Sequence, residues 1–343
     1  MRVIVDRERA RTLFDTLVAA FEARAYPYAL KDAQVPHIPE NLPRGGFRDE
    51  CSRAGYFFAL CYYMRGGIRS DYAAKRLSRV YDLEPRIFLP EAGSKTPVEF
   101  LQWILKGVGL GYNLKKISQL WIENSERVVD FFGGDFRNIF KDVESYEAAC
   151  ERIQNKESAR RRAPGSYPGF LGFQEKMVSM LIYFFMDAGF IDPWHFPVPV
   201  DFHVLRVFFA HEVLRVEEYD NRNFYKPEVL AAARELTKSY AREHDLDPLR
   251  LSEVFWCLSR SICERHPGNT SSGGRIRRGR KTILTPGVVD WRFSQQRAYH
   301  SACASCPVEG TCNWNIPSSP YYIQGKLVVR GRRERSPQLH ISD

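Results

Sequence analysis

Three cysteines late in this 343-residue chain have the spacing of ligands to one metal centre. Cys303 and Cys306 form a C-x2-C pair, and Cys312 follows after five further residues. Two thiolates three positions apart can hold a metal from a tight turn, while a third returns from the far side of a short loop. Thiolate ligands select iron–sulfur clusters or zinc. The spacing therefore predicts a metal site, and three free thiols without metal are the alternative.

A fourth ligand would have to come from further up the chain. Cys263 is favoured, because it ends a predicted helix just before a His-Pro-Gly turn, where a side chain can face a loop. Cys257 lies in an apolar stretch and is predicted to be a core residue. The remaining cysteines sit singly within helical patterns and are typical of buried small side chains, namely Cys51, Cys61 and Cys150.

Basic side chains are concentrated in three runs, at 160–162, 275–281 and 330–335. The formal net charge is +9, which favours a polyanionic partner without requiring one. Each run could neutralise phosphates of a nucleic acid, or could simply be a solvated loop. The run that we expect to contact DNA consists of Arg275, Arg277, Arg278, Arg280 and Lys281.

Composition excludes two classes of protein. Hydrophobic residues make up 44% of the chain and charged residues 27%, unlike a disordered chain. The most apolar stretch, 178–185, is too short to cross a bilayer, and acidic residues interrupt the N-terminal region before any signal peptide could form. We expect a cytoplasmic, monomeric protein without a membrane partner.

The elements that must position these residues are predicted to be helices, because apolar residues recur at three and four positions. No strand–helix alternation is present. The GVGLG motif at 107–111 lies between two predicted helices and indicates a turn rather than a phosphate-binding loop. Asp201 is a predicted helix cap after a Pro-rich segment. We expect an all-α fold with three regions: an N-terminal helical region at 1–95, a helical core at 96–265, and a basic and cysteine-containing region at 266–343.

The cysteine spacing and a second segment resemble the helix-hairpin-helix DNA glycosylases, the group of endonuclease III and adenine glycosylase. PGFLGFQEKMV followed by VPVDFHVLRV is similar to the hairpin and catalytic segment of that family, LPGVGxKTA and VDTHVxRV. Leu171 and Gln174 depart from the hairpin pattern, and Gln296 stands where the family has its first cluster cysteine. The resemblance implies two helical subdomains flanking a cleft, with a 4Fe–4S cluster, or alternatively zinc, on Cys263, Cys303, Cys306 and Cys312.

The same resemblance implies catalytic roles for two residues. An ionised Asp201 would stabilise the cationic sugar formed when an N-glycosidic bond breaks, and would orient the attacking water. Lys176 would attack the sugar C1′ and allow strand cleavage, provided its amine is deprotonated. A plain helix cap and a surface lysine are the alternatives for these two residues.

Base and DNA recognition are expected around these two residues. A flipped base needs aromatic stacking surfaces and a few polar groups. The candidates for base binding are Tyr167, Phe173, Trp194, His195 and His203, and the candidates for DNA contact beside the basic run are Gly172, Gln174 and Arg206.

We therefore expect an N-glycosylase that removes a damaged or modified base from double-stranded DNA, with lyase activity if Lys176 acts. Two alternatives stay open. The queuosine-salvage N-glycosylases are similar through FFGGDFRNIF and the Asp201 segment, which would imply a nucleoside or nucleotide substrate. The other alternative is a non-catalytic nucleic-acid-binding protein that uses its metal loop and basic runs.

Overall fold

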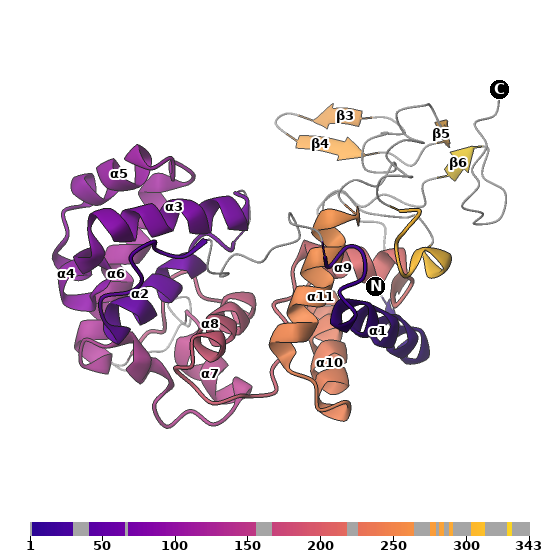
Figure 1. The fold of residues 1–343 in the computed structure, drawn as a ribbon, viewed down its shortest axis with the longest axis horizontal. Coiled ribbons are helices and arrows are strands. Elements are labelled where there is room, and N and C mark those ends of the chain that lie inside the picture. Colours follow the sequence, from indigo (N-terminus) through magenta and orange to yellow (C-terminus); the bar gives the residue numbers. More distant parts are fainter. Residues whose placement is uncertain are drawn as a thin grey trace. The chain divides into compact units, whose positions relative to one another are not determined.

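The structure of the chain, a computed structural model, is built mainly from eleven α-helices within its described residues (Figure 1). This confirms the all-α class. No helix among the described residues has both the length and the apolar content needed to cross a membrane. The structure describes residues 2–29, 41–65, 68–155, 167–217, 226–263, 275–278, 281–284, 288–290, 303–312 and 328–330.

The chain folds as two compact units. Unit 1 comprises Met1–Gln34 and Val200–Asp343, and unit 2 comprises Val35–Pro199. These boundaries differ from the three regions expected from the sequence. The difference arises because α1 (Arg7–Glu22) packs on α10 (Pro227–Glu243) and α11 (Pro248–Ser261), more than 200 residues along the chain. Local periodicity contains no information about such a contact.

Unit 2 is a helical body with an aromatic core. Phe58 on α2 stacks on Phe173 and contacts Phe136 and Phe170. Helix α8 is buried along most of its length, as its apolar sequence predicts. The elements of unit 2 in chain order are α2 (Glu50–Cys61), α3 (Ser70–Leu83), η3 (Pro85–Phe88), α4 (Pro90–Lys95), α5 (Val98–Gly107), α6 (Leu114–Phe132), η4 (Phe136–Phe140), α7 (Tyr146–Ile153) and α8 (Glu175–Asp187).

Glycines form the turn between α5 and α6 and also end α6, as the sequence predicts. The motif at 107–111 is a turn between α5 and α6, and Gly109 has a φ of +91°. This positive φ favours glycine, and a Cβ there would also lie 2.8 Å from the Tyr72 hydroxyl, at the end of an exposed side chain. At the other end, Gly133 and Gly134 have positive φ and stop the helix.

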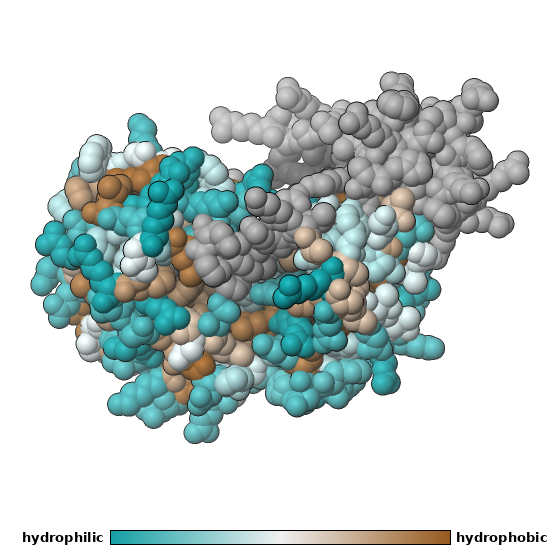
Figure 2. Space-filling model, viewed as in Figure 1, coloured by the Kyte–Doolittle hydropathy of each residue, from teal (hydrophilic) through white to brown (hydrophobic). Residues whose placement is uncertain are grey.

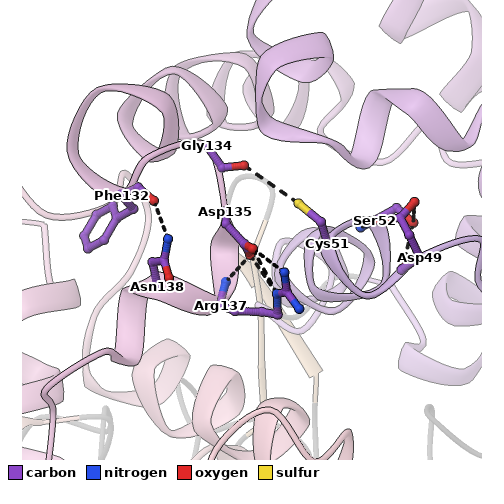
Figure 3. A network of polar contacts seen from close by, with 8 residues as sticks. All are labelled: Asp49, Cys51, Ser52, Phe132, Gly134, Asp135, Arg137 and Asn138. Atoms are coloured by element: carbon purple, nitrogen blue, oxygen red, sulfur yellow. Dashed lines mark hydrogen bonds and ion pairs between the residues drawn. The ribbon is translucent and has the colours of Figure 1, made fainter.

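A polar network fixes the segment after α6 (Figure 3). Asp135 caps η4 by accepting a hydrogen bond from the Arg137 backbone N–H and three more from its guanidinium. The Cys51 thiol donates to the Gly134 carbonyl at 3.7 Å, which ties α2 to this turn. Cys51 is half-buried, and burial raises the pKa of its thiol to about 11. These contacts give FFGGDFRNIF a structural role.

Unit 1 is assembled around α1, α9 (Phe202–Ala210), α10 and α11. Phe14 on α1 contacts Phe208, Tyr240 and Phe255, one from each of the other three helices. The sequence did not indicate a strand pair between β1 (Arg2–Val5) and β2 (Leu214–Glu217), which run antiparallel. Four residues are too few for an alternating pattern to be distinguished from a helix start.

Further strands occur in the C-terminal part of unit 1. An antiparallel pair is formed by β3 (Arg275–Arg278) and β4 (Lys281–Leu284), and a parallel pair by β5 (Val288–Asp290) and β6 (Val328–Arg330). The sequence analysis did not predict the strands at 275–278 and 281–284. The described part of the basic run lies on the β3–β4 pair.

Candidate active site

Asp201 occupies the N-cap of α9, as predicted. Its Oδ1 accepts a hydrogen bond from the His203 backbone N–H at 2.8 Å. Val200 is buried and anchors the preceding backbone, while the Asp201 side chain itself is half-buried. The N-terminus of a helix favours negative charge. The local sequence thus holds a carboxylate at the start of α9 without removing it from solvent.

Behind this carboxylate, α9 is attached to α11 through one serine. His203 Nδ1 lies 3.0 Å from Ser259 Oγ, and Arg206 Nη1 donates to the same Oγ at 3.2 Å and to the Ser259 carbonyl at 3.3 Å. Ser259 is fully buried. The sequence analysis did not identify Ser259, because a single serine in an apolar helix carries no signal for such a role.

The structure does not place Arg206 where it could contact DNA. Its side chain is only 3% exposed, and its guanidinium lies 4.9 Å from the Phe202 ring centroid. A buried guanidinium with these contacts holds α9 against α11 rather than reaching a phosphate. The expectation of DNA contact at Arg206 is replaced by a structural role.

In unit 2, Lys176 lies in the first turn of α8 and is half-buried. Its Nζ donates to the Met64 carbonyl at 2.8 Å. Attack of this amine on a sugar would require that hydrogen bond to open.

The predicted hairpin before α8 is a tight turn held by α6. Gly172 has a φ of +80°, and a Cβ there would approach the Arg65 guanidinium to 2.7 Å. Asn124, fully buried on α6, accepts from the Leu171 N–H at 2.7 Å and donates to the Leu171 carbonyl at 3.0 Å. Gln174 is the N-cap of α8, and its side chain makes no capping hydrogen bond. Sequence reasoning missed Asn124, since nothing local links it to a turn 47 residues away.

The five candidates for base binding occupy different environments. Phe173 is fully buried beside Phe58 and is a core residue, which corrects the expectation for it. The Tyr167 ring contacts Phe131, and its buried hydroxyl has no hydrogen-bond partner among the described residues. Trp194 is half-buried, His195 is exposed and His203 is bound to Ser259.

The four predicted cysteine ligands all lie in unit 1. Cys263, Cys303 and Cys312 are buried, and Cys306 is half-buried. Burial raises the pKa of the Cys303 thiol, and interactions with Cys312, Cys263 and Cys306 raise that pKa further. Within the described ranges, however, no three His, Cys, Asp or Glu side chains come together closely enough to hold a metal ion.

The cysteine loop at 303–312 is ordered by its own turns and by one anchor. The Cys306 N–H donates to the Cys303 carbonyl at 2.9 Å, and the Cys312 N–H donates to the Glu309 carbonyl at 3.0 Å. His211 Nδ1 lies 2.8 Å from Thr311 Oγ1, which fixes the loop beside the end of α9. Cys257 is buried on α11, in agreement with its prediction as a core residue.

The basic residues are only partly described. Arg275, Arg277 and Arg278 lie on β3, Lys281 begins β4, and Arg280 is outside the described residues. The run at 160–162 is also outside them, as is most of the run at 330–335.

Neither the models of known protein families nor the curated proteins contain a match to this chain.

Proposed function

We propose that this protein is an N-glycosylase that removes a damaged or modified base from double-stranded DNA. The observation that carries the proposal is the position of Asp201. Its carboxylate is half-buried at the N-cap of α9, within the segment that resembles the catalytic segment of the helix-hairpin-helix glycosylases. The tight turn at Gly172, with its positive φ, is compatible with the hairpin that the same resemblance implies.

The chemistry follows from the charge that develops during bond cleavage. When the bond between base and C1′ breaks, the sugar becomes cationic, and a carboxylate beneath it stabilises that cation. Asp201 supplies this charge and accepts a proton from the attacking water. The hydrogen bond from the His203 N–H to Oδ1 fixes the orientation of the carboxylate. Ser259 maintains the geometry by binding His203 and Arg206.

Water, rather than Lys176, is proposed as the nucleophile. A lysine that donates to the Met64 carbonyl at 2.8 Å has its amine directed at the protein backbone. The reaction is therefore proposed to be hydrolysis, without a Schiff base and without strand cleavage.

Cys263, Cys303, Cys306 and Cys312 carry thiolate donors of the kind that a 4Fe–4S cluster or zinc takes, and the loop would have to draw them closer together to hold one. Cys263 follows α11, and the other three lie in the loop at 303–312. When bound, such a group would fasten this loop to the end of α11. No step of base release is assigned to it.

The test of the proposal is mass-spectrometric detection of free bases released from a panel of modified duplex DNAs. Asp201→Asn keeps the cap hydrogen bond but removes the charge, so base release should fall by about a hundredfold or more while DNA binding persists. Asp247→Asn is the matched control, because Asp247 caps α11 through an equivalent bond to the Leu249 N–H at 2.9 Å. Release of bases from free nucleosides but not from DNA would favour the small-molecule alternative. Unimpaired release by Asp201→Asn would refute the assignment.

A further inference from the structure

A group of exposed aromatic side chains lies on α3, on α5 and in the turn between α5 and α6. Six large hydrophobic side chains are prominently exposed in the described part of the chain, and four of them belong to this group. Trp103 is the extreme case, at 70% exposed. Hydrophobic residues over α5 are visible on the surface in Figure 2. The four aromatic residues are Tyr72, Phe100, Trp103 and Tyr112.

Two contacts link parts of this group, one within α5 and one between α3 and the turn after α5. Phe100 and Trp103 lie one turn apart on α5, with ring centroids separated by 5.9 Å. From α3, the Tyr72 hydroxyl donates to the Gly109 carbonyl at 3.5 Å, in the same turn that carries Tyr112. The fixed turn therefore brings α3 to the end of α5. Clusters of exposed aromatic residues commonly mark binding sites.

Cations accompany the aromatic residues in a repeating arrangement. The Arg76 guanidinium lies 4.9 Å from the Tyr72 ring centroid, Lys106 follows Trp103 by three positions, and Lys115 follows Tyr112 by three. Each of the three segments thus presents a flat ring and a positive charge within one helical turn. No acidic side chain forms an ion pair with these three cations within the described residues.

Charge over the wider surface points the same way. Residues 69–83 and 98–116 contain seven basic and three acidic side chains. One of the acids, Asp71, is already paired with Arg69 at 2.7 Å. The surface is therefore complementary to a polyanion.

We propose that this aromatic–basic face, formed by Tyr72, Arg76, Phe100, Trp103, Lys106 and Tyr112, binds an unpaired nucleic-acid strand. Each nucleotide has one flat base, which can stack on an aromatic ring, and one negative phosphate, which can pair with a cation. Each segment of the face offers one ring and one cation. Bases stack on aromatic side chains with little dependence on sequence, and cations follow the backbone. An acidic peptide matches the charges, but it lacks a flat group at each repeat. The proposal requires no N-glycosylase activity and no role for Asp201.

Binding of the full chain to a fluorescein-labelled oligothymidylate of about twelve nucleotides tests this proposal. Trp103→Ala should weaken binding by roughly tenfold, the effect expected when one base stack is removed. Leu83→Ala is the matched control, since Leu83 is 66% exposed at the end of α3 and offers no ring. Its affinity for the strand should be unchanged.

A second variant separates stacking from charge. Lys106→Gln should lower the dependence of binding on salt by about 0.7 in logarithmic slope, as expected when a single strand is held by one phosphate fewer. Lys141→Gln, an exposed lysine after η4, should leave the slope unchanged.

Two results would overturn the proposal. One is wild-type affinity of Trp103→Ala for oligothymidylate. The other is an acidic peptide, tested as polyglutamate of equal charge, that displaces the strand equally well from wild type and Trp103→Ala. Because base release from duplex DNA is measured separately, loss of strand binding with retained base release leaves the N-glycosylase proposal standing.

Discussion

If the protein is the N-glycosylase proposed above, Lys176 would determine which of two mechanisms it uses. Its contact with the Met64 carbonyl ties its amine to the backbone of unit 2. The resemblance to the bifunctional glycosylases suggests a nucleophile, whereas this contact supports a structural lysine.

We expect Lys176→Gln to retain base release, because glutamine can still donate to the Met64 carbonyl and water remains the nucleophile. We also expect no borohydride-trapped adduct between the wild-type protein and substrate DNA, since only an imine is reduced to a stable adduct. The two measurements are base release by mass spectrometry and adduct formation on denaturing gels. A trapped adduct that disappears in Lys176→Gln would show instead that Lys176 attacks the sugar.

Asp135 illustrates how a single carboxylate makes the stability of unit 2 depend on pH. Burial acts to raise its pKa, but the hydrogen bonds from the Arg137 guanidinium and backbone outweigh burial and lower the pKa overall. A pKa that is lower in the folded state means that ionised Asp135 stabilises the fold. That stabilisation is present above the unfolded pKa of about 3.9 and is lost as the pH falls through the folded value.

Asp135→Asn should therefore reduce the free energy of unfolding at pH 7 by about 1 kcal/mol, the usual cost of a weakened cap. The deficit should be smaller at a pH below the lowered pKa of folded Asp135, where the wild-type carboxylate is itself protonated. Urea unfolding at pH 7 and at the low pH measures the deficit. Asp130→Asn, at an exposed position on α6, provides the comparison and should show little deficit at either pH. An equal deficit for Asp135→Asn at both pH values would argue against a role for its charge.

At the scale of elements, helical periodicity was sufficient to locate the helices but not the contacts between them. The apolar sequence of α8 predicted a buried helix, and α8 is buried. The cap at Asp201 was also visible in the sequence, because a cap depends only on neighbouring residues. Arg206 and Phe173 were misjudged for the opposite reason. Their burial is set by α11 and α2, which are remote in sequence.

The end of α11 and the cysteine loop provide an element-scale prediction. We expect the purified protein to contain iron and sulfide, and we expect Cys263→Ser to lose most of the metal because one of four thiolates is removed. Cys257→Ser should keep the metal, since Cys257 is buried on the helix itself. Iron and sulfide assays after anaerobic purification measure both variants. A colourless protein with one zinc and no sulfide would replace the cluster by zinc, and metal loss only in Cys257→Ser would reassign the fourth ligand.

At the scale of the whole molecule, the two ends of the chain build one unit together. Phe14 of α1 packs against Tyr240 of α10 and Phe255 of α11, so both segments contribute to the core of unit 1. The chain returns to unit 1 at Val200, so Asp201 is the second residue of that segment. Lys176 belongs to unit 2. Sequence patterns indicated both residues but not this division, because the division depends on packing between residues more than 200 positions apart.

Net charge and local charge make different predictions for DNA binding. With a formal net charge of +9, any decrease in positive charge weakens attraction to DNA at long range. Direct phosphate contacts are distinguished by the salt dependence of binding, since each contact releases counterions from duplex DNA. The run on β3 and β4 is the candidate for such contacts.

Replacing Arg277, Arg278 and Arg280 by Gln should therefore lower the logarithmic salt slope for duplex DNA by about 0.9 for each phosphate that the variant no longer binds. The effect should be the same for all sequences, because phosphates carry no base identity. A triple replacement of Arg7, Arg11 and Arg24, which are exposed in the N-terminal segment of unit 1, removes equal charge and serves as the control. Fluorescence anisotropy over a range of salt concentrations measures both. If the two triple variants change the slope equally, net charge alone explains the affinity and the β3–β4 run makes no phosphate contact.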